Sequence, residues 1–162
     1  KMHKKTYLVT GANQGLGLEA VRQLALLPQT KRVYMACRTE SKALAAIKRL
    51  VEENSSNRRI DKNKLVFVSF DASDSKEMIA QKISQGLLNF PKEDKDEEKK
   101  LRLDGLLFNA GGLGHDTSGK PTGPNQILDM YQINILGHIH LLEALLKITR
   151  SQQAQSSCQH QQ

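Results

Sequence analysis

The chain has 162 residues, of which 38% are hydrophobic and 25% charged, and its formal net charge is +7. This length suits one domain with its own core and is too short for two ordinary domains. No apolar run approaches the roughly 18 residues that cross a bilayer, and residues 1–5 lack the apolar segment of a secretory signal. We therefore expect a soluble, cytoplasmic protein. The chain begins with Lys1 and not with methionine. An upstream segment that carries a membrane anchor is therefore an alternative that stays open.

The positive charge does not by itself indicate nucleic acid. The basic residues are scattered, and aromatic residues make up only 4% of the chain, with no stacking platform among them. Cys37 and Cys158 have neither the spacing of metal ligands nor that of a disulfide framework. His138 and His140 do not share a helix face, and no third ligand accompanies them. We expect no nucleic acid and no metal, and an anionic small ligand accounts for part of the positive excess.

Apolar runs and helical spacings alternate along the chain. Strands are predicted at 5–10, 32–37, 64–70 and 103–109, and helices at 15–27, 41–53, 75–88 and 125–150. This order predicts an α/β fold, a Rossmann-type doubly wound parallel sheet that is incomplete at about four strands. We expect residues 1–150 to form this nucleotide-binding domain and the polar tail 151–162 to be disordered. Polar loops are expected at 54–59, 91–100 and 113–124.

Local signals set the predicted helix faces and ends. In the first helix, Leu16, Ala20, Leu24 and Leu27 recur at helical spacing and predict the buried face. Ser41 is the expected N-cap of the second helix.

A glycine-rich turn between the first strand and the first helix predicts a phosphate site. It reads Thr10-Gly11-Ala12-Asn13-Gln14-Gly15-Leu16-Gly17. Gly11 suits a tight turn, Gly15 lets a diphosphate approach the backbone, and Gly17 lets helix and strand pack closely. The helix start adds unpaired N–H groups and a partial positive charge. A turn that merely joins two elements is the alternative.

Further candidates follow the other strands, because ligands of such sheets bind beyond the carboxyl ends of the strands. Arg38 follows the second strand, and its guanidinium suits a 2′-phosphate, which favours NADP(H) over NAD(H). A simple surface arginine is the alternative. Asp71 follows the third strand, where its carboxylate can accept a hydrogen bond from an adenine amino group while Ala72 packs near the ring. A helix-capping aspartate is the alternative.

The segment after the fourth strand and the middle of the last helix supply the remaining candidates. Asn109, Ala110 and Gly111 are small enough for a cofactor to lie on their backbone, and the Asn109 amide can tie neighbouring strands together. Asn134 interrupts an apolar helix, which is costly unless its amide is satisfied. A kink or a bound water would explain it.

These features occur together in an order that resembles the short-chain dehydrogenase/reductase family. The matching residues are the turn 10–17, Ala36-Cys37-Arg38, Asp71, Asn109-Ala110-Gly111 and Asn134-Ile135-Leu136-Gly137-His138. The resemblance covers residues 5–149 and points to the classical NADP-dependent branch, near the retinol-dehydrogenase-like and carbonyl-reductase-like enzymes. It implies an oxidoreductase that transfers hydride between the nicotinamide of NADP(H) and a carbonyl or alcohol substrate. It also implies that Asn134 is a catalytic residue, in the proton relay.

The family's catalytic serine and its Tyr-x-x-x-Lys pair do not appear in the sequence. The tyrosines are Tyr7, Tyr34 and Tyr131, and none has a lysine four positions later. We therefore expect an N-terminal part of such an enzyme, with negligible turnover alone and an apolar sheet edge that favours homo-oligomers. The alternative is a non-catalytic nucleotide-binding or interaction module. The substrate itself cannot be read from these residues.

Overall fold

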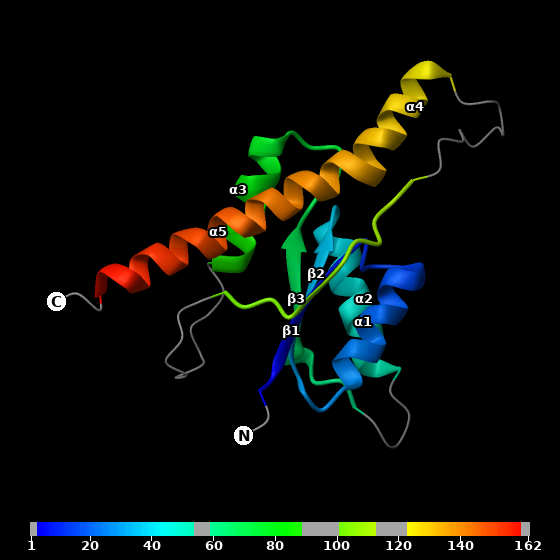
Figure 1. Ribbon diagram of the computed structural model, residues 1–162. Coiled ribbons are helices and arrows are strands. Elements are labelled where there is room, and N and C mark those ends of the chain that lie inside the picture. The colour runs from blue at the N-terminus through cyan, green and yellow to red at the C-terminus, as the bar shows by residue number, and fades with distance from the viewer. Residues whose placement is uncertain (1–2, 54–58, 89–100, 113–122, 160–162) are drawn as a thin grey trace.

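The computed structural model describes residues 3–53, 59–88, 101–112 and 123–159. Four parallel strands form one sheet in the order β3-β2-β1-β4. Helices α1 and α2 cover one face, and α3 and α5 cover the other (Figure 1). This arrangement confirms the predicted α/β fold with its parallel, Rossmann-like sheet. The expected loops at 91–100 and 113–122, and most of 54–59, lie outside the described residues.

Three of the four strands are apolar because helices bury both of their faces, whereas the fourth, at the sheet edge, is partly exposed. Their bounds are Lys5–Thr10 for β1, Thr30–Cys37 for β2, Leu65–Ser69 for β3 and Gly105–Leu107 for β4. Along β1, Leu8 points into the core under α3 and α5, while Val9 points into the core under α1 and α2. Both side chains are completely buried. The sheet therefore has one core on each face, and both depend on β1.

Strand β4 is shorter than the predicted segment 103–109. Asp104 lies just before β4, and its Oδ2 accepts the backbone N–H of Thr6 at 2.8 Å. At the other end, the N–H of Asn109 donates to the hydroxyl of Thr10, at 2.9 Å, in place of a ladder bond. The pairing of β4 with β1 thus comprises three residue pairs. At its start the N–H of Asp104 also donates to the carbonyl of Thr6, at 2.8 Å, and at its end the Thr10 hydroxyl replaces a backbone acceptor.

The helices are α1 Gly15–Leu26, α2 Glu40–Glu52, α3 Lys76–Leu88, α4 Pro124–Tyr131 and α5 Gly137–Gln159, with a short 3₁₀ turn at Lys62–Lys64. A π-helical turn, Gln132–Leu136, joins α4 to α5. In place of the single helix expected at 125–150 there is therefore one rod with a π-helical turn after its first eight residues, and the rod extends past the sheet (Figure 1). Within the described residues, no helix has the length and apolar character needed to span a membrane.

Three local predictions need correction. Helix α1 buries Leu18, Val21 and Ala25, whereas Leu16, expected on the buried face, is 83% exposed. The N-cap of α2 is Thr39 and not Ser41. Helix α5 continues to Gln159, so the polar stretch 151–159 is helical where we expected disorder. One cause is Gln152, whose side-chain oxygen accepts the N–H of Leu101 at 2.9 Å and ties this end of the helix to the segment before β4.

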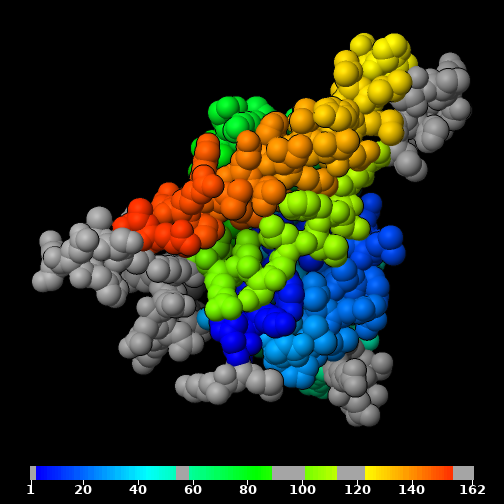
Figure 2. Space-filling view, viewed as in Figure 1, coloured from blue at the N-terminus to red at the C-terminus, as the bar shows by residue number. Residues whose placement is uncertain are grey.

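An apolar surface runs along the free side of β4 and along the rod. Leu106, Leu107 and Phe108 are each about two fifths exposed. On the rod, a stripe of apolar side chains recurs at helical spacing, formed by Leu128, Tyr131, Ile135, Ile139, Leu142 and Leu146. In Figure 2 the segment from residue 101 to 112 and helix α5 lie side by side on the visible face.

Candidate cofactor site

The glycine turn lies at the carboxyl end of β1, beside the end of β2. The N–H of Gly11 donates to the carbonyl of Ala36 at 2.9 Å, and Gly11 has φ +63°. A Cβ on Gly17 would collide with the carbonyl oxygen of Gly11, so this helix can start so close to the strand only with glycine. Gly15 has φ +55° with no atom within 4 Å of the position of a Cβ. The turn is therefore open to its outside at Gly15.

Among the described residues, no side chain caps the start of α1 or places a carboxylate in its first turn. The N-cap residue Gln14 makes no side-chain capping bond, and the first turn holds no acidic residue. The first N–H groups of a helix have no acceptor inside the helix. Gln14, Gly15 and Leu16 are exposed here. This end of α1 can thus receive an anion with its N–H groups and its dipole.

The end of β2 supports the turn through Cys37. This thiol is 1% exposed, and the backbone N–H groups of Ala12 and Asn13 hydrogen-bond to its sulfur. Burial raises the pKa of Cys37 to about 11, against the opposing effect of those two hydrogen bonds. Cys37 is therefore a neutral, packed thiol. Arg38 comes next, is exposed and makes no ion pair with any residue that the structure describes.

The hydroxyl of Thr10 joins the glycine turn to the segment after β4. Its oxygen accepts the N–H of Asn109 and the N–H of Ala110, both at 2.9 Å. The side-chain amide of Asn109 donates to the carbonyls of Thr10, at 3.2 Å, and of Gly11, at 3.4 Å. Asn109 thus ties two neighbouring strands together at their carboxyl ends. This role of Thr10 is not among the sequence predictions, although its position at the head of the glycine motif was an available signal.

Asn134 lies in the π-helical turn and holds the segment after β4 against the rod. Its Oδ1 accepts the N–H of Gly112 at 2.8 Å, and its Nδ2 donates to the carbonyl of Gly112 at 3.1 Å. A Cβ on Gly111 would lie 3.1 Å from Oδ1. The amide is therefore satisfied by backbone groups, and the local irregularity of the helix accompanies it.

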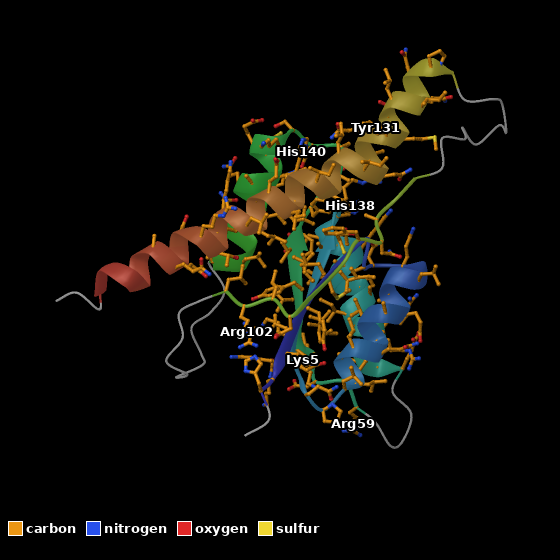
Figure 3. The ribbon with its side chains drawn as sticks, in the orientation of Figure 1. Lys5, Arg59, Arg102, Tyr131, His138 and His140 are labelled. Atoms are coloured by element: carbon orange, nitrogen blue, oxygen red, sulfur yellow. The ribbon has the colours of Figure 1, made fainter. Side chains whose placement is uncertain are left out.

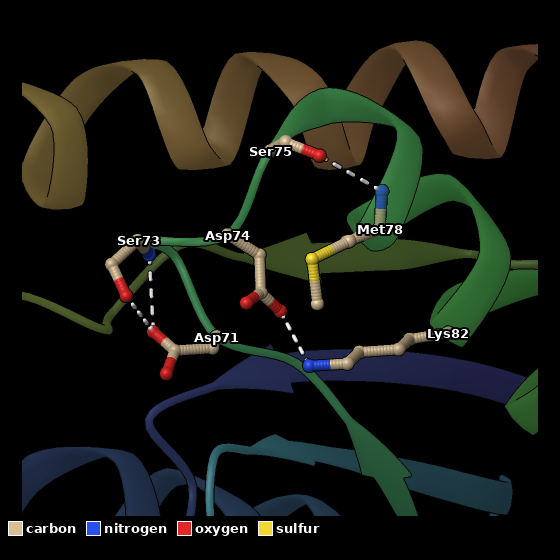
Figure 4. Close-up of polar contacts among 6 residues, drawn as sticks. All are labelled: Asp71, Ser73, Asp74, Ser75, Met78 and Lys82. Carbon is tan, nitrogen blue, oxygen red and sulfur yellow. Dashed lines mark hydrogen bonds and ion pairs between the residues drawn. The ribbon is translucent and has the colours of Figure 1, made fainter.

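Asp71 follows β3 and shapes the turn that leads to α3 (Figure 4). Its Oδ1 accepts the N–H and the hydroxyl of Ser73, at 3.0 and 2.7 Å. Ser75, and not Asp71, caps α3, because the hydroxyl of Ser75 accepts the N–H of Met78 at 3.3 Å. Oδ2 of Asp71 has no hydrogen-bond partner among the described residues. Ala72 is buried beneath the rod, where its carbonyl accepts the side chain of Gln132 at 3.3 Å.

His138 projects from α5 toward the strand ends, whereas His140 lies toward α3 (Figure 3). Nε2 of His138 lies 3.0 Å from the hydroxyl oxygen of Thr10, and Nδ1 lies 3.3 Å from the carbonyl of Asn134. Burial lowers the pKa of His138 below its usual value, against the hydrogen bond to Asn134. The described residues contain no group of three or more His, Cys, Asp or Glu that could hold a metal ion.

Most of the candidate residues therefore lie around one rim of the sheet. Arg38 follows β2, the glycine turn follows β1, and the segment 109–111 follows β4. These three strands are neighbours in that order. Asp71 extends this row at β3, and Asn134 reaches it from the rod.

The sequence of the chain is similar to those of known dehydrogenases. A family model described as short chain dehydrogenase matches residues 5–156. A short chain dehydrogenase/reductase of Colletotrichum higginsianum is 34% identical over 154 residues, which are 95% of this chain and 34% of that protein. Retinol dehydrogenase 12 of Homo sapiens is 35% identical over 145 residues, which are 88% of this chain and 38% of that protein.

Solved structures share the fold. A putative short chain dehydrogenase from Escherichia coli CFT073, complexed with NADPH, is 27% identical and has a TM-score of 0.65 over 91% of this chain and 54% of that one. The chain thus spans about a third of the length of these curated relatives and about half of the solved structure. From its sequence and its fold together, the chain belongs to the short-chain dehydrogenase/reductase family.

Proposed function

We propose that this chain binds NADP(H) along the carboxyl rim of its sheet and that the whole protein is an oxidoreductase acting on a carbonyl or alcohol. The observation that carries this proposal is the uncapped start of α1, with open space above Gly15. An NADPH complex among the similar solved structures supports the choice of cofactor. When bound, the nicotinamide supplies or accepts the hydride.

The chain's own residues fit such a dinucleotide. The N–H groups at the start of α1 would bind the diphosphate. The guanidinium of Arg38 would pair with the 2′-phosphate, because a neutral thiol at Cys37 leaves no carboxylate to repel it. Asp71 has Oδ2 left to accept the adenine amino group. Ala110 and Gly111 present only small side groups beside the turn.

Asn109 and Asn134 would act by holding the site in shape. The amide of Asn109 is engaged with Thr10 and Gly11, and that of Asn134 with Gly112. In the whole protein we assign Asn134 to the proton relay that the family resemblance implies.

The first prediction concerns the choice between cofactors. We expect Arg38→Ala to weaken NADPH binding about ten- to a hundredfold, the usual contribution of a charged hydrogen bond, and to leave NADH binding unchanged. Fluorescence titration of both cofactors measures this. Arg59→Ala is the matched control, because it removes an exposed arginine at the opposite end of the sheet (Figure 3). Equal losses from the two variants, or none from either, would remove Arg38 from the site.

The second prediction concerns turnover. Because no tyrosine in the sequence is followed by a lysine four residues later, we expect the chain to bind NADPH without oxidising it. The measurement is NADPH absorbance with a panel of aldehydes and ketones, next to a titration of the same sample. Binding without turnover is also the behaviour of a nucleotide-binding module. Steady turnover by the purified chain would contradict the proposal that the acid/base residues lie elsewhere in the whole protein.

A further inference from the structure

His138 is a buried, titratable side chain to which the proposed function gives no task. It is 7% exposed. Its ring stacks on Phe70, with centroids 6.0 Å apart, and on Phe108, with centroids 5.0 Å apart. Phe70 follows β3, Phe108 follows β4, and Thr10 ends β1. One ring from α5 therefore touches the carboxyl ends of three strands (Figure 3).

The hydrogen atoms around Thr10 can be assigned by counting. A hydroxyl has two lone pairs and one hydrogen. The N–H groups of Asn109 and Ala110 occupy both lone pairs. The hydrogen can then go only to Nε2 of His138, at 3.0 Å, or to the carbonyl of Leu107, at 3.4 Å. The shorter contact favours the imidazole, so Nε2 is an acceptor and carries no hydrogen.

The second ring nitrogen agrees with this assignment. An imidazole that accepts at Nε2 and is neutral carries its hydrogen on Nδ1. Nδ1 lies 3.3 Å from the carbonyl of Asn134, which can only accept. The aromatic and hydroxyl groups around the ring do not titrate near neutral pH, and burial favours the neutral imidazole. Each polar atom of this cluster therefore has a partner in one consistent arrangement.

We propose that His138 is a positioning residue of the cofactor site. In its neutral form, with the hydrogen on Nδ1, it fixes the Thr10 hydroxyl as the acceptor for Asn109 and Ala110 and so sets the glycine turn against the segment after β4. Through the Asn134 carbonyl it couples the same turn to the rod. Its effect on NADP(H) affinity rests on the proposed function, whereas the hydrogen-bond arrangement does not.

The tautomer is tested on the unmodified chain without cofactor. Long-range proton–nitrogen NMR of the imidazoles distinguishes a hydrogen on Nδ1 from one on Nε2. We expect a neutral His138 with its hydrogen on Nδ1 at pH 7. A hydrogen on Nε2, or a charged ring, would overturn the proposal. This measurement needs no variant and so does not depend on whether a variant folds.

Amide exchange tests whether the ring supports the Thr10 acceptor. His138→Phe keeps a ring between Phe70 and Phe108 but removes both nitrogens. We expect faster hydrogen exchange at the amides of Asn109 and Ala110 in this variant, and unchanged exchange in the control His140→Phe. His140 faces α3 and not the strand ends (Figure 3). Unchanged exchange at both amides in His138→Phe would overturn the proposal.

Affinity tests the consequence for the cofactor. We expect His138→Phe to weaken NADPH binding about tenfold, as for one lost hydrogen bond. His138→Gln offers a carbonyl oxygen to the Thr10 hydroxyl, so we expect binding within about threefold of the unmodified chain. Equal losses in both variants would reduce His138 to a packing residue. If the unmodified chain itself binds no NADPH, the proposed function fails, while the tautomer and exchange measurements still decide the role of His138.

Discussion

The Thr10 hydroxyl joins three segments that are far apart in the sequence. It links the end of β1 to residues 109 and 110 and to His138 in α5. A valine in its place would fill the same volume but would leave two partly buried N–H groups without this acceptor, at a cost of up to about 1–3 kcal/mol each. The specific role of threonine here is therefore its oxygen atom, and its position before the glycine turn makes the turn depend on contacts formed much later in the chain.

The third prediction is a pH dependence of stability that arises from His138. Its pKa is lowered in the folded protein, while the unfolded chain titrates near the ordinary value of about 6.5. Between these two values the unfolded state binds more protons, so the free energy of unfolding falls as the pH is lowered from 7 through the folded pKa. One proton limits the slope to about 1.4 kcal/mol per pH unit. Urea unfolding across this range measures it.

The comparison that isolates His138 uses its phenylalanine variant. We expect the free-energy difference between the unmodified chain and His138→Phe to shrink on acidification, because only the former takes up this proton. Parallel curves for the unmodified chain and His138→Phe would show that the imidazole does not carry the effect.

At the scale of elements, the fourth prediction concerns the contact between α1 and β1. In Gly17→Ala the added methyl would meet the carbonyl oxygen of Gly11, which is a backbone atom and cannot turn aside. We expect a loss of about 1–3 kcal/mol, as in other overpacked sites. Gly112→Ala is the matched control, because its methyl would enter open space. The midpoint of urea unfolding reports both, and equal midpoints would contradict the close approach.

The sequence predicts an element well where both of its faces are buried. The strands β1, β2 and β3 are built around apolar runs that helices cover on both faces, so their type and their sequence along the chain were predicted correctly, although β2 begins at Thr30, two residues before the predicted start. The bounds of β4 and α5 were predicted less well, because they depend on distant partners. Asp104 and Asn109 shorten β4 by bonding to β1, and Gln152 prolongs α5 by bonding to Leu101. Local propensity contains no information about these contacts.

The candidate site shows the same division. The glycine turn and Arg38 could be placed from the sequence, because each directly follows an apolar strand. Leu16 was expected on the buried face of α1, yet it is exposed, because the contact with Gly11 turns Gly17 and Leu18 inward instead. The partnership of His138 with Thr10 could not be predicted from spacing, since it requires the fold that brings α5 over the strand ends.

At the scale of the whole molecule, the fifth prediction concerns the apolar stripe of the rod. Exposed apolar area of this extent promotes association in water. We expect the chain to associate reversibly with rising concentration, and Ile139→Lys with Leu146→Lys to shift it toward monomer. Sedimentation velocity measures the distribution. Leu44→Lys, at an exposed leucine of α2, is the control and should leave association unchanged. A chain that stays monomeric at all concentrations would contradict the prediction.

The position of β1 at the centre of the sheet has a consequence for biosynthesis. The ribosome synthesises β1 before the other strands, and β2 can pair with it early. The other edge of β1 can pair only after residues 105–107 have been synthesised. Such a long sequence separation slows the closing of a sheet. Asn109, Ala110 and His138 emerge later still, so the glycine turn obtains its last hydrogen bonds only after these residues have left the ribosome. A nascent chain therefore has its first two strands well before the hydrogen bonds around the glycine turn are complete.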